Sequence, residues 1–176
     1  MSLDRLWAGW RAAYVADHSA GIADATVTDG GSVFSRIVAS GAPDRDTGIV
    51  HRGERCFAIL NRFPYGTGHL LVMPYREVAD LAELDDDEHT ELWLTVRDAV
   101  AALRSAYEPD GVNVGANLGE AAGAGVPGHI HVHVLPRWSA DSNFMTSVAE
   151  TRVLPEALPD TWDKVTAAWP TPPATP

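Results

Sequence analysis

Two different spacings of apolar residues run along the middle of the chain. Short apolar runs at residues 56–60 and 69–73 flank a turn-forming segment at 64–68, which is typical of two connected strands. From residue 85 onward the apolar side chains recur every three or four residues, which predicts one long amphipathic helix. The apolar stripe of this helix consists of Leu92, Val96, Ala99, Val100 and Leu103.

Polar residues mark both ends of the expected helix. Asp85 has the short carboxylate of an N-cap residue, and Glu88 stands three residues later, as a capping box requires. The turn-forming segment at 109–111, Pro-Asp-Gly, ends the helix. Beyond it, strands are expected at 112–114 and 130–134.

A last helix is expected over about residues 160–169, with Trp162, Val165 and Trp169 on one face. The order of elements is therefore strands, a long helix and again strands. This order favours an α+β fold with an antiparallel sheet over a parallel array of alternating strands and helices.

The two ends of the chain differ from the middle. Residues 1–31 read as an N-terminal arm, with a short amphipathic stretch followed by a Gly-rich and Asp-rich connection. Residues 170–176, Pro-Thr-Pro-Pro-Ala-Thr-Pro, cannot form a helix and are expected to be extended or disordered. We expect one domain over residues 1–169.

Composition excludes several classes of protein. The formal net charge is −11, from 13 basic and 24 acidic residues, which argues against nucleic-acid binding because that depends on clustered Lys and Arg. The single cysteine, Cys56, cannot form an internal disulfide. No signal-peptide pattern and no apolar stretch of about 20 residues is present, so we expect a cytoplasmic protein without a membrane partner.

Three histidines alternate with apolar residues in the run from His129 to Leu135. Side chains of a strand alternate between its faces, so His129, His131 and His133 are expected on one face. The apolar residues between them are expected on the other face, toward the core. A row of imidazoles on one face needs polar partners, which points to a functional site.

Two kinds of chemistry fit such a row. His-x-His on a strand is a common metal-binding arrangement, and His51 or His69 could complete it. A neutral imidazole, with an unperturbed pKa of about 6.5, can also attack phosphorus without a separate base. The glycine-rich loop at 119–128 runs directly into the histidines and favours the second interpretation, because its backbone N–H groups can converge on an anion.

The histidine run resembles the signature of the histidine triad (HIT) family. The segment 58–75 is similar to the nucleotide-binding hairpin of that family, and the resemblance covers roughly residues 32–138. Trp138 and the segment 141–145 resemble the branch that cleaves dinucleoside polyphosphates such as diadenosine tetraphosphate, as does the stretch 6–11. The resemblance implies a HIT-like antiparallel sheet of about five strands with one long helix and shorter helices.

The resemblance also implies a reaction. His131 would be the nucleophile that forms a covalent nucleotidyl intermediate, while His129 and His133 would bind phosphoryl oxygens. Inorganic phosphate or water would then release the nucleotide, with phosphorolysis expected, and no cofactor would be needed. The residues that would bind the purine nucleotide or dinucleoside polyphosphate are Asn61, His69, Asn117, Gly123, Gly125 and Trp138.

Three further residues are expected to border the adenine or to belong to the core: Phe34, Ile37 and Leu60. The chain also departs from the family in two places. Ser32-Val-Phe-Ser35 stands where many bacterial members have Cys-x-Phe-Cys, so we expect no structural zinc, because serine is a poor zinc ligand. Residues 124–128 lack the hydroxyl residue that often precedes the triad, which affects the rate and the acceptor.

Three other functions remain open from the sequence. A nucleoside phosphoramidate hydrolase would use the same nucleophile with another leaving group. A metalloenzyme would use the histidines as ligands, and a nucleotide-binding sensor would bind without turnover. The resemblance further implies a homodimer, for which the long helix with Trp93 could supply a contact face.

Overall fold

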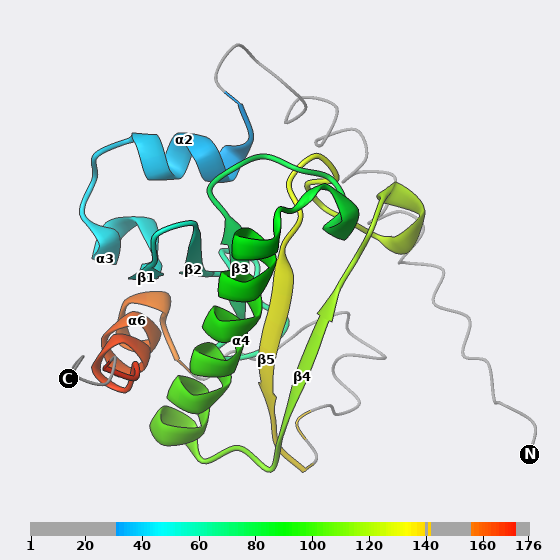
Figure 1. The fold of residues 1–176 in the computed structure, drawn as a ribbon. Helices are drawn as coiled ribbons and strands as arrows, with labels where there is room; N and C mark the ends of the chain where they lie inside the picture. The colour runs from blue at the N-terminus through cyan, green and yellow to red at the C-terminus, as the bar shows by residue number, and fades with distance from the viewer. Residues whose placement is uncertain (1–30, 140, 142–155, 172–176) are drawn as a thin grey trace, which may run out of the picture.

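An antiparallel sheet forms the centre of the molecule in the computed structural model, which describes residues 31–139, 141 and 156–171. The sheet has five strands in the order β1-β2-β3-β5-β4, and every neighbouring pair is antiparallel (Figure 1). The α+β fold expected from the sequence is therefore confirmed. The strands are β1 Ile49–Arg52, β2 Cys56–Leu60, β3 Leu70–Pro74, β4 Gly111–Ala116 and β5 Val132–Arg137.

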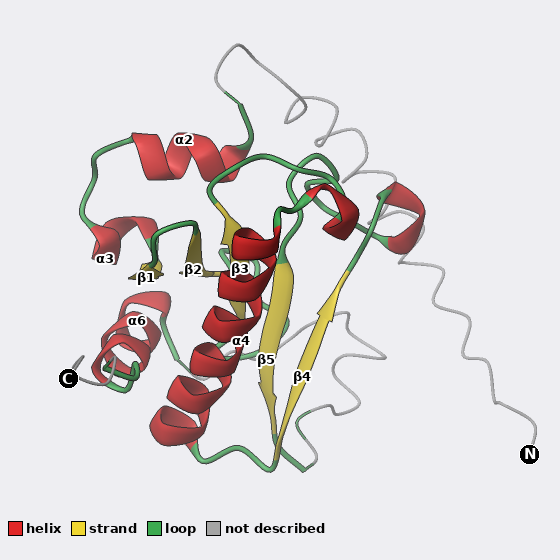
Figure 2. Ribbon diagram, in the orientation of Figure 1, coloured by secondary structure: helices red, strands yellow, loops and turns green. Residues whose placement is uncertain are grey.

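Helices lie on both faces of the sheet (Figure 2). The long helix α4 crosses β2, β3 and β5 on one face, and α6 packs beside it against β1. On the other face the short helix α2 adds apolar residues to a second buried cluster. The helices are α2 Val33–Ala39, α3 Asp44–Thr47, α4 Asp86–Tyr107 and α6 Leu158–Ala167, with 3-10 turns at Leu81–Glu83 and Glu120–Ala122.

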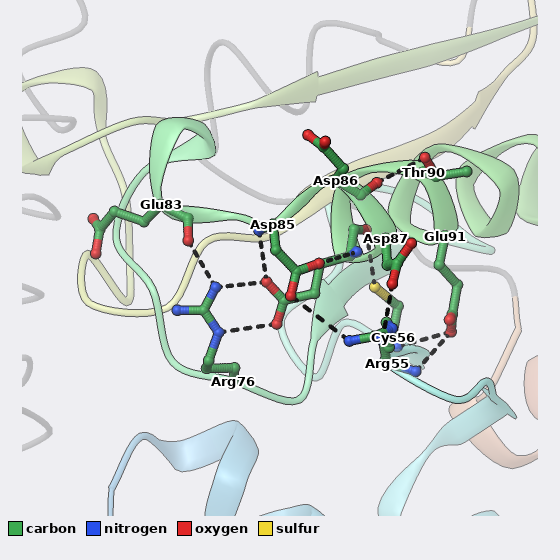
Figure 3. A network of polar contacts seen from close by, with 10 residues as sticks. Arg55, Cys56, Arg76, Glu83, Asp85, Asp86, Asp87, Thr90 and Glu91 are labelled. Carbon is green, nitrogen blue, oxygen red and sulfur yellow. Dashed lines mark hydrogen bonds and ion pairs between the residues drawn. The ribbon is translucent and has the colours of Figure 1, made fainter.

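The start of α4 is the capping box expected from the sequence. Asp85 accepts a hydrogen bond from the Glu88 backbone N–H at 2.8 Å, and the Glu88 carboxylate accepts one from the Asp85 N–H at 3.1 Å. Arg76 donates two more hydrogen bonds to Glu88, at 2.9 and 2.6 Å (Figure 3). These bonds fasten the connection after β3 to the first turn of the helix.

Alternation along the strands divides the core in two. Side chains under α4 and α6 form one cluster, which includes the expected helix stripe together with Val132 and Val134. Side chains on the opposite face form a second cluster with Phe34 of α2. Leu60 belongs to the first cluster and is 6% exposed, so it is a core residue and not a wall of a site on the histidine face.

Some boundaries differ from the sequence-based expectation. The strand expected at 130–134 is β5, Val132–Arg137, which begins later because the Ile130 N–H donates to the Val78 carbonyl at 2.7 Å and not to a strand. The end of helix α4 agrees with the expectation: the helix stops at Tyr107, directly before the Pro-Asp-Gly turn, and its C-cap residue Glu108 has a left-handed conformation with φ 46°.

Several expectations concern parts of the chain outside the described residues. These are the N-terminal arm up to residue 30, most of the segment 141–145, and the end of the tail from residue 172. In the part of the chain that is described, no helix combines the length and the apolar character needed to cross a membrane.

Candidate active site

The three histidines lie where the chain enters β5. His133 is part of the strand, His131 directly precedes it, and His129 stands two residues earlier. The rings of His131 and His133 have centroids 5.0 Å apart, and Val132 between them is buried under α4. The expected alternation of imidazoles and core residues is therefore present, although only His133 is paired in the sheet.

His129 is fully buried, and both of its ring nitrogens have partners. Its Nε2 lies 2.8 Å from the Pro74 carbonyl oxygen, which can only accept, so Nε2 carries the hydrogen. Its Nδ1 then accepts from the Ser32 hydroxyl at 2.7 Å. Burial lowers the pKa of His129, and the ring is neutral. Since neither nitrogen is available, the three-histidine metal site does not fit this arrangement.

His131 has a defined tautomer. Its Nδ1 lies 2.9 Å from the backbone carbonyl of His129, so Nδ1 carries the hydrogen and Nε2 keeps a lone pair. The side chain is 6% exposed, and burial lowers its pKa below the ordinary value for histidine. The neutral form of the His131 ring is therefore favoured, with a lone pair on Nε2.

His69 and His133 form a chain of hydrogen bonds with the turn before β3. The Tyr65 N–H donates to Nδ1 of His69 at 3.0 Å, so His69 carries its hydrogen on Nε2. That hydrogen points to Nδ1 of His133 at 2.9 Å, which leaves the His133 hydrogen on Nε2. Nε2 of His133 is buried, and no described residue accepts from it. An unpaired buried donor is unusual and marks a place for a ligand oxygen.

Electrostatics keep His133 neutral. Burial and the neighbouring His131 lower the pKa of His133 to about 4. The ring of Tyr65 stacks on His133 with a centroid distance of 5.6 Å and lies tilted against His69 at 4.5 Å. The contribution of Tyr65 was not foreseen from the sequence, because it depends on a backbone N–H and on the shape of the turn.

Asn61 closes the same turn. Its Oδ1 accepts from the Phe63 N–H at 3.0 Å, and its Nδ2 lies 3.3 Å from Nδ1 of His69. The structure thus brings Asn61 and His69 together at the ends of β2 and β3, on the face that carries His133. The contact between Asn61 and the Phe63 N–H is also one that asparagines commonly make in turns.

Asn117 and Gly123 also lie together, at the end of β4. The last pair of the β4–β5 ladder is Ala116 with Val132, so Asn117 follows at the level of His131. Its Nδ2 donates to the Gly123 carbonyl at 3.3 Å. Gly123 has φ 89°, and a side chain on Gly125 would meet nothing within 4 Å, so this part of the loop is open.

Trp138 and His51 lie away from the histidine row, Ile37 is a packing residue, and Phe34 lies against the histidines. Trp138 follows the far end of β5 and packs edge-on against Tyr107 at 6.2 Å, a strand length of roughly 20 Å from His131. His51 stacks on Trp169 at 4.8 Å and does not join the histidine row. Ile37 packs against the second core cluster. Phe34 contacts the rings of both His129 and His131.

Ser32, Ser35 and Glu77 form a polar cluster beside His129. The hydroxyl oxygens of the two serines are 3.2 Å apart, and the Ser32 N–H donates to the Glu77 carboxylate at 2.8 Å. These residues do not fit a zinc ion, because hydroxyls are weak zinc ligands and the nearby imidazole nitrogen is already hydrogen-bonded. Glu77 was missed in the sequence, where no spacing connects it with residues 32–35.

A buried neutral imidazole with a free nitrogen, next to an imidazole N–H without a partner, suits attack on a group that carries anionic oxygens. The family comparison agrees with this geometry. The HIT domain model matches residues 42–140, more than half of the chain. The chain therefore belongs to the HIT domain family.

Individual relatives and solved structures show how similar this chain is to particular proteins. The chain is 36% identical over 167 residues to the AP-4-A phosphorylase of Mycobacterium tuberculosis, which covers 95% of this chain and 85% of that protein. It is also 36% identical over 93 residues to the asymmetrical bis(5'-nucleosyl)-tetraphosphatase of Schizosaccharomyces pombe, 53% of this chain and 50% of that protein. A zinc-bound histidine triad protein from Mycobacterium smegmatis superposes with TM-score 0.62 at 29% identity, covering 77% and 91% of the two chains.

Proposed function

We propose that this chain cleaves dinucleoside polyphosphates of the diadenosine tetraphosphate type through a nucleotidyl intermediate on His131. The observation that carries the proposal is the tautomer of His131. The His129 carbonyl holds the Nδ1 hydrogen, so the Nε2 lone pair is available for attack. The lowered pKa of His131 keeps this nitrogen unprotonated at neutral pH.

The reaction proceeds in two displacements. The Nε2 lone pair of His131 forms a bond to the α-phosphorus, and the bond from that phosphorus to the bridging oxygen breaks. The leaving nucleoside polyphosphate takes the electron pair, and the imidazole, with its hydrogen still on Nδ1, becomes cationic. An oxygen of inorganic phosphate or water then attacks the phosphorus, and the electron pair of the breaking N–P bond returns to Nε2.

His133 binds a phosphoryl or leaving-group oxygen through its unpaired Nε2–H. His69 supports this role, because it accepts from Tyr65 and donates to His133, which fixes the His133 hydrogen on Nε2. His129 acts through its backbone carbonyl, which holds the ring of His131. Each of these groups is neutral, so the site stabilises the phosphate chain through aligned N–H donors.

The nucleotide would be bound at the ends of β2 and β4. Asn61 would contact the ribose from the turn beside His69, and Asn117 would contact the phosphates from the level of His131. Gly123 and Gly125 would offer backbone N–H groups from the exposed loop. The distance of Trp138 from His131 means that it could meet only the remote end of a long substrate.

Phosphorolysis is favoured over hydrolysis by the similarity to the mycobacterial phosphorylase, which extends over 95% of the chain. Hydrolysis remains the second possibility because the yeast relative, which matches a shorter segment, is named a tetraphosphatase. Cleavage of nucleoside phosphoramidates would use the same histidines with a different leaving group.

Product analysis with diadenosine tetraphosphate separates these functions. ADP plus ATP, formed only when inorganic phosphate is present, is the expected result. AMP plus ATP without phosphate would establish hydrolysis instead. Cleavage of adenosine phosphoramidate alone would identify a phosphoramidase, and binding of nucleotide without any product would contradict an enzymatic function.

A homodimer is proposed as the assembly. The strand β4 is an edge of the sheet, and its Val114 is 44% exposed. The neighbouring helix α4 carries Trp93 and Leu94 at 42% and 45% exposure. Exposed apolar side chains beside an open strand edge suit pairing with a second copy. Analytical ultracentrifugation over a concentration series should give a dimer, and a monomer at every concentration would contradict this assembly.

A further inference from the structure

The cluster of Ser32, Ser35 and Glu77 joins three separate segments of the chain. Ser32 is the N-cap of α2, and its hydroxyl accepts from the Ser35 N–H at 3.2 Å. Glu77 lies in the connection after β3, and its carboxylate accepts from the Ser32 N–H at 2.8 Å and from the Ser35 hydroxyl. The third segment is the histidine run, which the cluster reaches through His129.

The hydrogen atoms in this cluster can be assigned. Nε2 of His129 gives its hydrogen to the Pro74 carbonyl, so Nδ1 must accept. The hydroxyl of Ser32 is therefore the donor in the 2.7 Å contact with Nδ1. The hydrogen bonds from Ser35 and Ser32 lower the pKa of Glu77, so the carboxylate is ionised and accepts only.

The backbone next to the cluster is shaped to admit the Glu77 carboxylate. Gly31 has φ 76°, a conformation that residues with side chains rarely adopt. A Cβ atom at this position would lie 2.3 Å from Oε1 of Glu77. The close approach of the carboxylate to the start of α2 therefore depends on a glycine directly before the N-cap.

The cluster is connected to the nucleophile in two ways. The carbonyl of His129 accepts the Nδ1 hydrogen of His131 at 2.9 Å. Phe34, two residues after the N-cap, contacts the His129 and His131 rings with centroid distances of 5.6 and 5.5 Å. A shift of the His129 backbone or of α2 would therefore also displace His131.

We infer that Ser32 and Glu77 are positioning residues, which hold His129 and through it His131 by hydrogen bonds at a place where the chain cannot hold a zinc ion. The hydroxyl of Ser32 fixes the ring of His129, and the carboxylate of Glu77 fixes Ser32 and Ser35. A hydrogen-bonded frame of this kind supplies the partner of the lone pair on Nδ1 of His129, which could otherwise be a metal or another donor. The effect on turnover rests on the proposed function of His131.

The first test reads the His129 ring directly. In ¹⁵N NMR spectra of the histidine rings, the wild type should show Nδ1 of His129 as an accepting nitrogen and Nε2 as protonated. Ser32→Ala should shift the Nδ1 signal of His129, and Ser32→Thr, which keeps the hydroxyl, should restore it. Ser40→Ala is the matched control, because it removes an exposed hydroxyl from the other end of α2. Equal spectra for Ser32→Ala and Ser40→Ala would overturn the inference.

The second test uses Glu77, whose exposed position makes its replacement compatible with folding. Glu77→Ala should lower kcat about 10-fold with little change in KM, because a small displacement of the nucleophile slows the chemical step. Glu77→Gln keeps one accepting oxygen and should lie between Glu77→Ala and the wild type. Glu83→Ala, in the same connection, is the control. The inference fails if Glu77→Ala and Glu83→Ala have the same kcat.

Metal analysis separates the frame from a hidden metal site. After incubation with zinc and desalting, the wild type should retain far less than one zinc per chain. Stoichiometric zinc that is lost in Ser32→Ala would contradict the hydrogen-bonded frame. The NMR result does not depend on turnover. A catalytically active His131→Ala would therefore refute the proposed function and leave the positioning of His129 to be decided by the spectra.

Discussion

The two faces of the sheet are built from the same strands but have different roles. Toward α4 and α6, β5 contributes Val132 and Val134, which are 1% and 0% exposed within an apolar cluster. Toward the opposite face the same strand contributes His133, with His131 directly before it, beside the smaller apolar cluster that contains Phe34 and Leu71. Both faces gain stability from burial of apolar area, but only this face also buries a row of imidazoles.

Burial of imidazoles has a cost that the apolar face does not bear. The pKa values of His129, His131 and His133 are all lowered by burial, so each ring must stay neutral in the folded protein. Nε2 of His133 is buried without a partner among the described residues. This unpaired donor keeps the histidine face in an unfavourable state, which an oxygen of a bound phosphate chain would relieve.

The largest expected difference between the two faces appears when one histidine is removed from each. His131→Ala should lower turnover of diadenosine tetraphosphate by about 10³-fold or more, because the proposed mechanism forms its covalent bond on this residue. His51→Ala, which removes the ring stacked on Trp169, should leave turnover nearly unchanged. Steady-state kinetics gives the comparison, with circular dichroism to confirm folding. Equal activity of the two variants would remove the distinction between the faces.

A substitution in the apolar core under α4 tests the other face of the sheet. Leu92→Ala, at a fully buried position of α4, should lower the free energy of unfolding by about 2–5 kcal/mol through lost burial and a cavity. Turnover at a temperature where the variant is folded should stay close to that of the wild type. Urea denaturation measures the stability. A large loss of kcat in the folded variant would mean that the two faces are not independent.

The stability of the protein should depend on pH through the buried histidines. The folded pKa of His133 is about 4, below its unfolded value of about 6.5, so the unfolded chain binds the proton first. The contribution of this group is present in full above about pH 6.5 and is lost as the pH falls toward 4. Urea unfolding at pH 7.5 and pH 5 should show a smaller loss for His133→Asn than for the wild type. An identical loss would contradict the lowered pKa.

The smallest expected effect concerns the network at the start of α4 (Figure 3). Glu88→Gln removes the charge that Arg76 contacts while keeping a side chain suited to the capping box. Because the Arg76 side chain is 51% exposed, the loss of stability should be only about 1 kcal/mol. Thermal unfolding measures it, with Glu83→Gln as the control. No loss of stability would show that solvent fully screens the pair.

Most of the fold could be predicted because it rests on local patterns. The spacing of Leu92, Val96 and Leu103 defined α4, and the capping box placed its start. The alternation of histidines with apolar residues predicted which side chains share a face. The start of β5 was missed, because it depends on the bond between Ile130 and the distant Val78 carbonyl.

The histidines themselves could be found from the sequence, but their proton states could not. The tautomers of His129 and His131 are set by the backbone carbonyls of Pro74 and His129, which leave no trace in a pattern of side chains. Glu77 reaches the site across a large sequence separation from Ser32, so no spacing reveals it. The distance between Trp138 and the histidines likewise follows from the length of β5.

The role proposed for His131 can be tested by trapping the nucleotidyl intermediate. The protein is incubated with diadenosine tetraphosphate without inorganic phosphate, quenched in base and digested with trypsin, which should release residues 105–137 as one peptide carrying all three triad histidines. We expect one added adenylyl group, located on His131 by fragmentation and absent in His131→Ala. Product formation with an adduct on another residue, or with none under any quench condition, would contradict His131 as the nucleophile.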